Sequence, residues 1–399
     1  MNLEAIQNEL RARGIAAWLF YDHHRRDPIA YRILGLPETG LATRRWYYLI
    51  PASGAPRKLT HRIEAGALDL LPGEPAVYAR WGELDAGLDR LVASLGPSPK
   101  IAMQYSPGCA VHRISLADAG TVEKLRALGA EIVSSGDLIS RFDAAWDAAM
   151  LASHRAAGRV IHAAIAGAFA EVRRRLDAGS PCTEFELQQW LVAQMRAGGL
   201  AVDEPPIVGI NDHANDPHFQ PAPRGSAPIR GGDLLLLDVF ARTAAPGSAF
   251  YDVTWMGYCL RPGEREPPAR FAEIFDLVRR ARDAGIALAQ SSAAARRPLR
   301  GFELDQAVRG VIAAAGLGDF FVHRAGHSLG RDVHSTGANC DDYESHDDRL
   351  VLPGCAFTIE PGVYGPRGEP FGVRSEVNVY YGDGVAEVTG PRQETIVNI

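Results

Sequence analysis

Residues 232–260 read GDLLLLDVFARTAAPGSAFYDVTWMGYCL, and this stretch decides the fold of the C-terminal part of the chain. Two runs rich in leucine, valine and aromatic residues flank the turn signal AAPGS, a pattern typical of an antiparallel hairpin. Residues 355–381, CAFTIEPGVYGPRGEPFGVRSEVNVYY, repeat this pattern around the turn YGPRGEP. The sequence therefore predicts two β-hairpins that are distant from each other along the chain.

Each predicted hairpin follows two predicted helices within residues 141–399. An alanine-rich helix comes first, and a capping box of Thr183 and Glu186 opens the second helix. Two further helices are predicted over about residues 268–290 and 303–315. Helix, helix, hairpin thus occurs twice, which indicates an internally duplicated α+β domain although the two halves share little residue identity.

Residues 1–140 show a different pattern, in which helices and strands alternate. A helix over residues 3–13 stops at Gly14, the segments IAAWLFY, RWYYLI, PAVYARW and KIAMQY are strand-like, and amphipathic helices lie between them. This order predicts an α/β domain. A chain of 399 residues exceeds the usual size of a single core, so we expect two domains, 1–140 and 141–399.

The composition excludes several classes of protein. Hydrophobic residues make up 46% and charged residues 23%, as in globular proteins, and a net charge of −6 argues against a nucleic-acid partner. The N-terminus lacks an apolar signal core, and no run approaches the length of a membrane span. The five cysteines are odd in number and contain no CxxC pair. We therefore expect a soluble cytoplasmic protein without a membrane partner.

The two hairpins each carry a pair of acidic residues. Directly opposed residues in a hairpin lie at equal distances from its centre. Asp238 and Asp252 have their midpoint inside AAPGS, and Glu360 and Glu376 have theirs at Gly368. Each pair is therefore predicted to face across its hairpin, with Cβ atoms roughly 4.5 to 5.5 Å apart.

Opposed acids on half-buried strands repel each other and need a compensating cation. Four carboxylates balance two divalent ions, and two-metal sites with ions roughly 3.5 to 4 Å apart activate a shared water. A ligand set dominated by oxygen favours Mn²⁺, with Co²⁺, Fe²⁺ and Zn²⁺ as alternatives. Two other interpretations stay open: the acids lie on a solvated strand face, or they form ion pairs with Arg374 and bind no metal.

Five segments resemble, in order, the metal-ligand motifs of the creatinase/aminopeptidase P metallopeptidases: LLLLDVF, YDVTW, GHSLG, TIEPGVY and GVRSE. The stretches AMQYSP, DAGTVE and HDDR are similar to those of bacterial Xaa-Pro peptidases within that family. The resemblance implies a C-terminal pita-bread fold with internal duplication, preceded by a creatinase-type α/β domain. It also implies a homodimer.

The resemblance assigns a role to each matched ligand position. Asp238 would bind one metal, Asp252 and Glu376 would bridge both metals, and His327 and Glu360 would complete the set. Glu360 would also be the acid/base that takes a proton from the metal-bridging water and delivers it to the leaving nitrogen. His327 rests on the resemblance alone.

Three further residues match family positions that contact the substrate or border the ligands. His218 in NDPHFQP and His334 match histidines that contact the substrate, and Arg374 matches the arginine of the GVRxE motif. The alternatives are a loop histidine, a surface histidine and an ordinary salt-bridge partner. His323 is expected to be structural or to support the ligands from behind.

The sequence also departs from the family pattern. Arg331 and Ser335 replace an apolar residue and an acid, and Val-Thr-Trp follows the second aspartate where many members have Arg-Thr. We expect these positions to line the cleft and to affect substrate identity more than metal binding. Trp81 has two interpretations, a core residue or one that reaches a neighbouring subunit's cleft.

The resulting prediction is a metal-dependent exopeptidase that cleaves the bond before a proline at the second position of dipeptides or longer peptides. Retention of all five ligands argues against creatinase, which works without metal, and against a non-catalytic module of the same fold. The large N-terminal domain argues against a methionine aminopeptidase. A same-fold metal-dependent lyase, or another small-molecule hydrolase, stays open.

Overall fold

The computed structural model describes residues 1–365 and 371–399, and these form two compact units, Met1–Asp143 and Ala144–Ile399. Part of the predicted turn YGPRGEP, including the expected hairpin centre at Gly368, lies outside the described residues.

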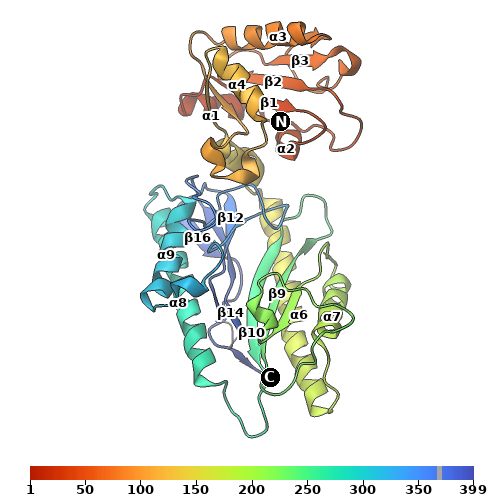
Figure 1. Cartoon of the computed structure of the whole chain (residues 1–399), viewed down its shortest axis with the longest axis vertical. Helices are drawn as coiled ribbons and strands as arrows, with labels where there is room; N and C mark the ends of the chain where they lie inside the picture. Colours follow the sequence, from red (N-terminus) through yellow and green to blue (C-terminus); the bar gives the residue numbers. More distant parts are fainter. Residues whose placement is uncertain (366–370) are drawn as a thin grey trace. The chain divides into compact units, whose positions relative to one another are not determined.

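The N-terminal unit is built on a mixed sheet, in which β1, β2 and β3 are labelled in Figure 1. The strand order of the sheet is β4-β3-β2-β1-β5-β6. Its strands are β1 Ala17–Asp22, β2 Trp46–Pro51, β3 Arg57–His61, β4 Glu74–Tyr78, β5 Lys100–Met103 and β6 Glu131–Ser134. Its helices are α1 Leu3–Ala12, α2 Pro28–Leu34, α3 Trp81–Ala93, α4 Ala119–Ala127 and α5 Gly136–Ile139.

Both faces of this sheet are covered by helices, because alternate residues of β1 enter different apolar clusters. Trp18 and Phe20 pack with residues of α1 and α2, whereas Ala17 and Leu19 pack with residues of α3 and α4. The predicted α/β character is confirmed. Trp81, however, is 81% exposed as the first residue of α3, so its interpretation as a core residue is wrong.

The first half of the C-terminal unit places two helices against a sheet (Figure 1). The helices are α6 Ala148–Asp177 and α7 Glu184–Ala197, and α7 begins with the predicted capping box of Thr183 and Glu186. The strands are β7 Leu200–Ala201, β8 Ile207–Ile210, β9 Leu234–Thr243, β10 Tyr251–Tyr258 and β17 Val397–Asn398. The sheet has the order β17-β10-β9-β7, and β8 also pairs with β9.

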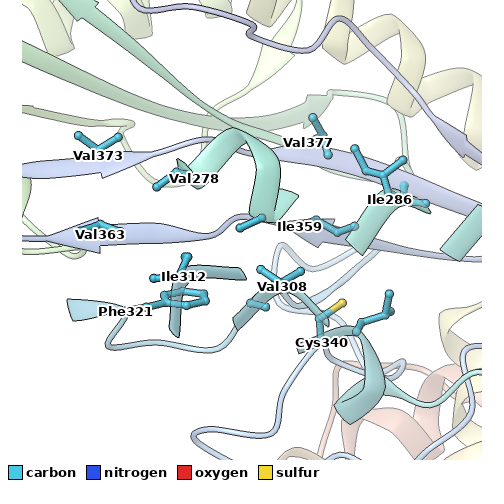
Figure 2. Close-up of a cluster of buried hydrophobic side chains, with 14 of the residues drawn as sticks. Val278, Ile286, Val308, Ile312, Phe321, Cys340, Ile359, Val363, Val373 and Val377 are labelled. Carbon is cyan, nitrogen blue, oxygen red and sulfur yellow. The ribbon is translucent and has the colours of Figure 1, made fainter. Parts of the chain in front are cut away.

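The second half repeats this arrangement with α8 Ala269–Ala294 and α9 Gly301–Ala314. Its strands are β11 Ser328–Leu329, β12 Cys355–Ile359, β13 Gly362–Tyr364, β14 Gly372–Arg374, β15 Val377–Gly382 and β16 Val385–Val388. Figure 2 shows how the helices and strands share one core, where Val278 and Ile286 of α8 and Val308 of α9 lie near Ile359 and Val377. The predicted internal duplication is therefore present.

The register of the first hairpin differs from the prediction. Asp238 pairs with Thr254, and Asp252 pairs with Phe240, so the predicted direct opposition of the two aspartates is wrong. The observed pairs are centred on Pro246, one residue after the predicted centre at Ala245, and this moves every partner by two positions. Because side chains alternate with a period of two, both aspartates still lie on the same face as diagonal neighbours.

The second hairpin keeps the predicted register. Ile359 pairs with Val377 on one side of the acids, and Gly362 pairs with Arg374 on the other. The continuous register places Glu360 opposite Glu376, as their spacing predicts. Within residues 1–365 and 371–399, none of the helices combines the length and apolar character that a membrane crossing requires.

Candidate metal centre

A cleft of about 680 Å³ in the C-terminal unit contains all five candidate ligands together with His218, His334 and Arg374. Asp238 comes from β9 and Asp252 from β10, whereas the other three ligands come from the ends of strands in the second half. His327 directly precedes β11, Glu360 directly follows β12, and Glu376 directly precedes β15. The duplicated fold thus brings segments from both halves to one site.

Three of the candidate ligands form a tight group. Asp252, His327 and Glu376 each offer a ligand atom within 4.8 Å of the other two. Nε2 of His327 lies 3.4 Å from Oδ2 of Asp252 and 3.5 Å from Oε1 of Glu360. Nδ1 of His327 lies 3.1 Å from the carbonyl oxygen of Ser328, to which it donates, so Nε2 is the nitrogen that faces the carboxylates.

Buried carboxylate oxygens without partners line the same cleft. Among the described residues, Oδ1 of Asp238, Oδ1 of Asp252 and Oε1 of Glu376 are buried and accept no hydrogen bond. A buried polar atom without a partner costs about 1 to 3 kcal/mol, and more when it is charged. Three such oxygens beside a correctly oriented imidazole fit the donor set of a divalent metal site.

The pKa values of the candidate ligands indicate that the site has too little positive charge for its four carboxylates. Burial raises the pKa of Asp238 to about 7, against the opposing charge of Arg374. Burial also raises the pKa of Asp252, and it raises the pKa of Glu376 well above its ordinary value, with the charges of Asp252 and Glu360 adding to the shift of Glu376. The four acids therefore cannot all ionise on the charges present, and divalent cations would supply what is missing.

Glu360 behaves differently from the other three acids. Burial raises its pKa, but the charges of His327 and Arg374 outweigh burial and lower the pKa to about 2. In return, burial lowers the pKa of His327, but a hydrogen bond to Asp252 and the charge of Glu360 raise it overall. Thr358 Oγ1 donates to Oε1 of Glu360 at 3.1 Å and fixes its orientation.

Arg374 contacts the ligand set directly. Its Nη2 donates to Oδ2 of Asp238, and its Nε donates to Oγ1 of Thr254 at 2.7 Å. Thr254 in turn donates to Oε2 of Glu376 at 2.8 Å. The ion pair that the sequence left open is present, but one guanidinium cannot balance four carboxylates. Sequence reasoning named Thr254 only as part of the Val-Thr-Trp departure and missed its contact with the ligands. The register that sets Thr254 opposite Asp238 reveals this contact.

The histidines outside the ligand set differ in their exposure to solvent. His218 and His334 are exposed residues of the cleft wall, and the His334 ring lies edge-on at 4.4 Å from the His327 ring. His323 is half-buried, and its Nε2 lies 2.8 Å from the Tyr364 hydroxyl. Burial lowers the pKa of His323 to about 4, so its ring is neutral and suited to support the site from behind.

The departures from the family pattern do not line the cleft, contrary to expectation. Among the described residues, the wall includes Val333 and His334 but neither Arg331 nor Ser335, and it omits the Val-Thr-Trp segment after Asp252. Ser335 is buried and Arg331 is exposed. Of the departing residues, only Thr254 touches the ligand set, through Glu376.

A duplicated helix–helix–sheet unit with acids and a histidine gathered between its halves is the architecture of the pita-bread metallohydrolases. The chain belongs to one family of that class, metallopeptidase family M24, whose family model matches residues 152–383. It is therefore a metal-dependent peptidase by family.

Individual relatives agree with this assignment. A Mycobacterium tuberculosis protein named "Probable dipeptidase PepE" is 29% identical over 353 residues, which is 88% of this chain and 84% of that protein. The Xaa-Pro dipeptidase of Lactobacillus helveticus is 31% identical over 163 residues, 40% of this chain and 38% of that protein.

Solved structures confirm the fold over the whole chain. The dipeptidase PepE of Mycobacterium ulcerans covers 100% of this chain and 96% of its own, with a TM-score of 0.66 and 23% identity. The Xaa-Pro dipeptidase of Bacillus anthracis covers 100% and 99%, with a TM-score of 0.61 and 20% identity. Both carry an equivalent of the N-terminal unit as well as the pita-bread unit.

Proposed function

We propose that this protein is a binuclear metal-dependent exopeptidase that removes the N-terminal residue before proline from dipeptides or longer peptides. The observation that carries the metal part is the set of three buried, partnerless carboxylate oxygens in the cleft that also contains His327. The proline preference rests on the names of relatives, which include Xaa-Pro dipeptidases and aminopeptidases.

Five residues would hold the two divalent ions: Asp238, Asp252, His327, Glu360 and Glu376. The oxygen-rich donor set favours Mn²⁺ over Co²⁺, Fe²⁺ and Zn²⁺. When bound, such ions supply Lewis-acid polarisation of the scissile carbonyl and lower the pKa of water.

The protein's own groups would carry the proton. Glu360 is oriented by Thr358, and its carboxylate would accept the proton of the attacking water. The resulting carboxylic acid can then protonate the leaving nitrogen of the proline. His218 and His334, on the cleft wall, would donate hydrogen bonds to the substrate carbonyl as negative charge develops there.

The proposal extends to assembly and location. Family resemblance favours a homodimer, for which sedimentation of the purified protein is the direct test. All five cysteines are free thiols, four of them buried, which supports a reducing, cytoplasmic location.

Metal analysis of the purified protein, combined with assays on Xaa-Pro dipeptides and Xaa-Pro-extended peptides with added Mn²⁺, tests the proposal. Glu360→Gln should keep the fold and reduce kcat by about 10²-fold or more, because the proton acceptor is lost. Residual activity near the wild-type level would show that the acid/base assignment is wrong. Bound metal without activity on any Xaa-Pro peptide would favour a lyase or another small-molecule reaction, and absence of bindable metal would overturn the central claim.

A further inference from the structure

A second cavity, of about 370 Å³, lies wholly within the N-terminal unit. Its walls come from the turn after β1, the segment that leads into β2, the end of β3 and the start of α3. None of the residues proposed for peptide hydrolysis belongs to it. The cavity therefore needs its own explanation.

The cavity is lined by cations without matching anions. Arg44, Arg45 and Arg80 all line it, and none of its lining residues is acidic. Across residues 1–365 and 371–399, none of these three guanidinium groups forms an ion pair. Elsewhere in the unit arginines do pair with acids, as Arg13 does with Asp137 at 2.9 Å. Three guanidinium groups without an ion pair thus converge on one cavity.

Histidines in the wall of this cavity supply hydrogen-bond donors in addition to those of the arginines. His23 and His24 lie edge-to-face with ring centroids 4.3 Å apart, and both face the cavity. Burial lowers the pKa of His23, and the positive charges of His24 and Arg45 lower it further. Burial is the largest cause of the shift, and the part due to charge has the sign expected beside Arg45, since cations near an imidazole disfavour its protonation.

The wall is held in place before any ligand arrives. The Arg25 guanidinium donates to three carbonyl groups in residues 37–40 at 2.6 to 2.8 Å, which ties the β1 turn to the next loop. The Glu64 carboxylate accepts from the backbone N–H groups of Thr43 at 2.9 Å and Arg44 at 3.2 Å. A wall fixed in this way loses little conformational freedom when it binds a ligand.

Trp81 gives the cavity a flat apolar side. It lines the cavity and is 81% exposed, which is unusual for a tryptophan. It is also the first residue of α3, a helix of 13 residues whose N-terminal partial charge adds to that of the arginines. An indole face beside a cationic pocket suits a ligand that is aromatic or flat at one end and anionic at the other.

We propose that this cavity binds a small anionic molecule that carries carboxylate or phosphate groups next to a flat apolar part. Arg44, Arg45 and Arg80 bind the anionic groups, and Trp81 stacks against the flat part. The lining residues differ from those that would hold the metal ions, and the test needs no turnover.

Two probes distinguish the two anionic chemistries: phenyl phosphate and benzene-1,3-dicarboxylate, with neutral benzyl alcohol as the comparison. Each is titrated by calorimetry into the full-length metal-loaded protein, in parallel with tryptophan fluorescence. At least one anionic probe should bind with a change in fluorescence, and benzyl alcohol should not bind. The probe that binds more tightly identifies the preferred anionic group.

A triple variant, Arg44→Gln with Arg45→Gln and Arg80→Gln, should weaken binding of that probe at least tenfold. The matched control, Arg11→Gln with Arg90→Gln and Arg126→Gln, removes the same charge from exposed sites outside the cavity and should bind as the wild type does. Trp81→Ala should weaken binding about threefold or more, through lost stacking, and should abolish the fluorescence change. Equal affinity in the wild type and the first triple variant, or failure of both anionic probes to bind, would overturn the proposal.

Discussion

The hydroxyl of Thr254 donates a hydrogen bond of 2.8 Å to Oε2 of Glu376. Thr254 lies on β10 in the first half of the C-terminal unit, and Glu376 directly precedes β15 in the second half. The same hydroxyl accepts a bond of 2.7 Å from Nε of Arg374. One buried hydroxyl thus joins the two halves at the candidate metal centre and orients Glu376 so that its other oxygen has no partner.

Thr254→Val should weaken metal binding while leaving the fold intact. Valine has nearly the same shape but leaves Oε2 of Glu376 and Nε of Arg374 without their shared partner. Loss of a group that orients a metal ligand typically reduces metal affinity about 10- to 100-fold. Competition with a chromophoric chelator measures this change.

Thr254→Ser is the matched control, because it keeps the hydroxyl and loses only a methyl group. It should retain metal affinity within a few-fold of the wild type. Equal losses in the valine and serine variants would mean that packing at residue 254, and not the hydrogen bond, controls the ligand.

Glu376→Gln should raise the thermal midpoint of the metal-free protein and remove the stabilisation that added metal gives. Burial and neighbouring acids raise the pKa of Glu376 well above its ordinary value, so replacing the acid by a neutral amide relieves repulsion. In the wild type, metal at about 100 times its Kd should add about 2.7 kcal/mol of stability. Calorimetric scans with and without Mn²⁺ measure both effects.

Asp347→Asn, in the same unit, is the control for Glu376→Gln, and it should lower the thermal midpoint. Asp347 is a buried acid whose oxygens accept from Arg349 at 2.8 and 2.6 Å, so its charge is already balanced. Breaking such a pair destabilises by about 3 to 5 kcal/mol, whether or not metal is present. If Glu376→Gln lowered the midpoint in the same way, Glu376 would be a structural acid and not one that awaits a metal.

The two hairpins show what the sequence could and could not predict. The spacing of Glu360 and Glu376 predicted their opposition correctly because the register continues unbroken on both sides of the acids. The spacing of Asp238 and Asp252 did not, because the hairpin is centred on Pro246, and AAPGS alone did not distinguish this centre from Ala245. Asp238 and Asp252 still lie on one face of the sheet, as predicted, because the pairing partners moved by an even number of residues.

Contacts between elements distant in sequence were beyond such reasoning. The bond from Thr254 to Glu376 spans 122 residues, and neither residue's local pattern points to the other. The interpretation of Trp81 as a core residue was wrong for a related reason. A large aromatic residue is usually buried, and only the tertiary structure shows that α3 exposes this one to solvent. The ligand motifs were recognisable because each lies within one short segment of the chain.

Gly326→Ala should displace His327 and reduce both stability and metal affinity. A Cβ at Gly326 would lie 2.0 Å from the backbone carbonyl oxygen of Thr358, which cannot be accommodated without moving one of the two segments. The backbone of Thr358 also donates to the carbonyl oxygen of His327 at 2.9 Å, so this movement reaches the candidate ligand directly. The thermal midpoint and the metal Kd together report the change.

Gly310→Ala provides the comparison for that substitution. Gly310 lies within α9 and is exposed, and a Cβ added there would have no neighbouring atom within 4 Å. Alanine at this position should stabilise the protein by about 0.5 to 1 kcal/mol, because it restricts the unfolded chain. A neutral effect of Gly326→Ala on metal affinity would show that the loop before His327 can relax without moving the ligand.

The folded protein should lose stability at acidic pH because His154, on α6, is buried and neutral. His154 donates from Nδ1 to the carbonyl oxygen of Phe250 at 2.6 Å and accepts at Nε2 from the Thr389 hydroxyl at 2.6 Å, so it is neutral. Burial lowers its pKa from 6.5 to about 4. Above pH 6.5 the imidazole is neutral in both the folded and unfolded states and has no effect on pH dependence.

Between pH 6.5 and pH 4 the unfolded chain takes up a proton at His154 that the folded chain does not, so stability falls as the pH falls. The pKa difference corresponds to about 3 kcal/mol over this window, at about 1.4 kcal/mol for each pH unit. His154→Asn should be less stable at pH 7, because it loses buried hydrogen bonds, but its stability should fall less steeply. Urea unfolding of the metal-free proteins at pH 7 and pH 5 measures the difference, which should narrow at pH 5. Parallel pH dependence in the two proteins would mean that His154 is protonated equally in the folded and unfolded states, and that burial does not control its pKa.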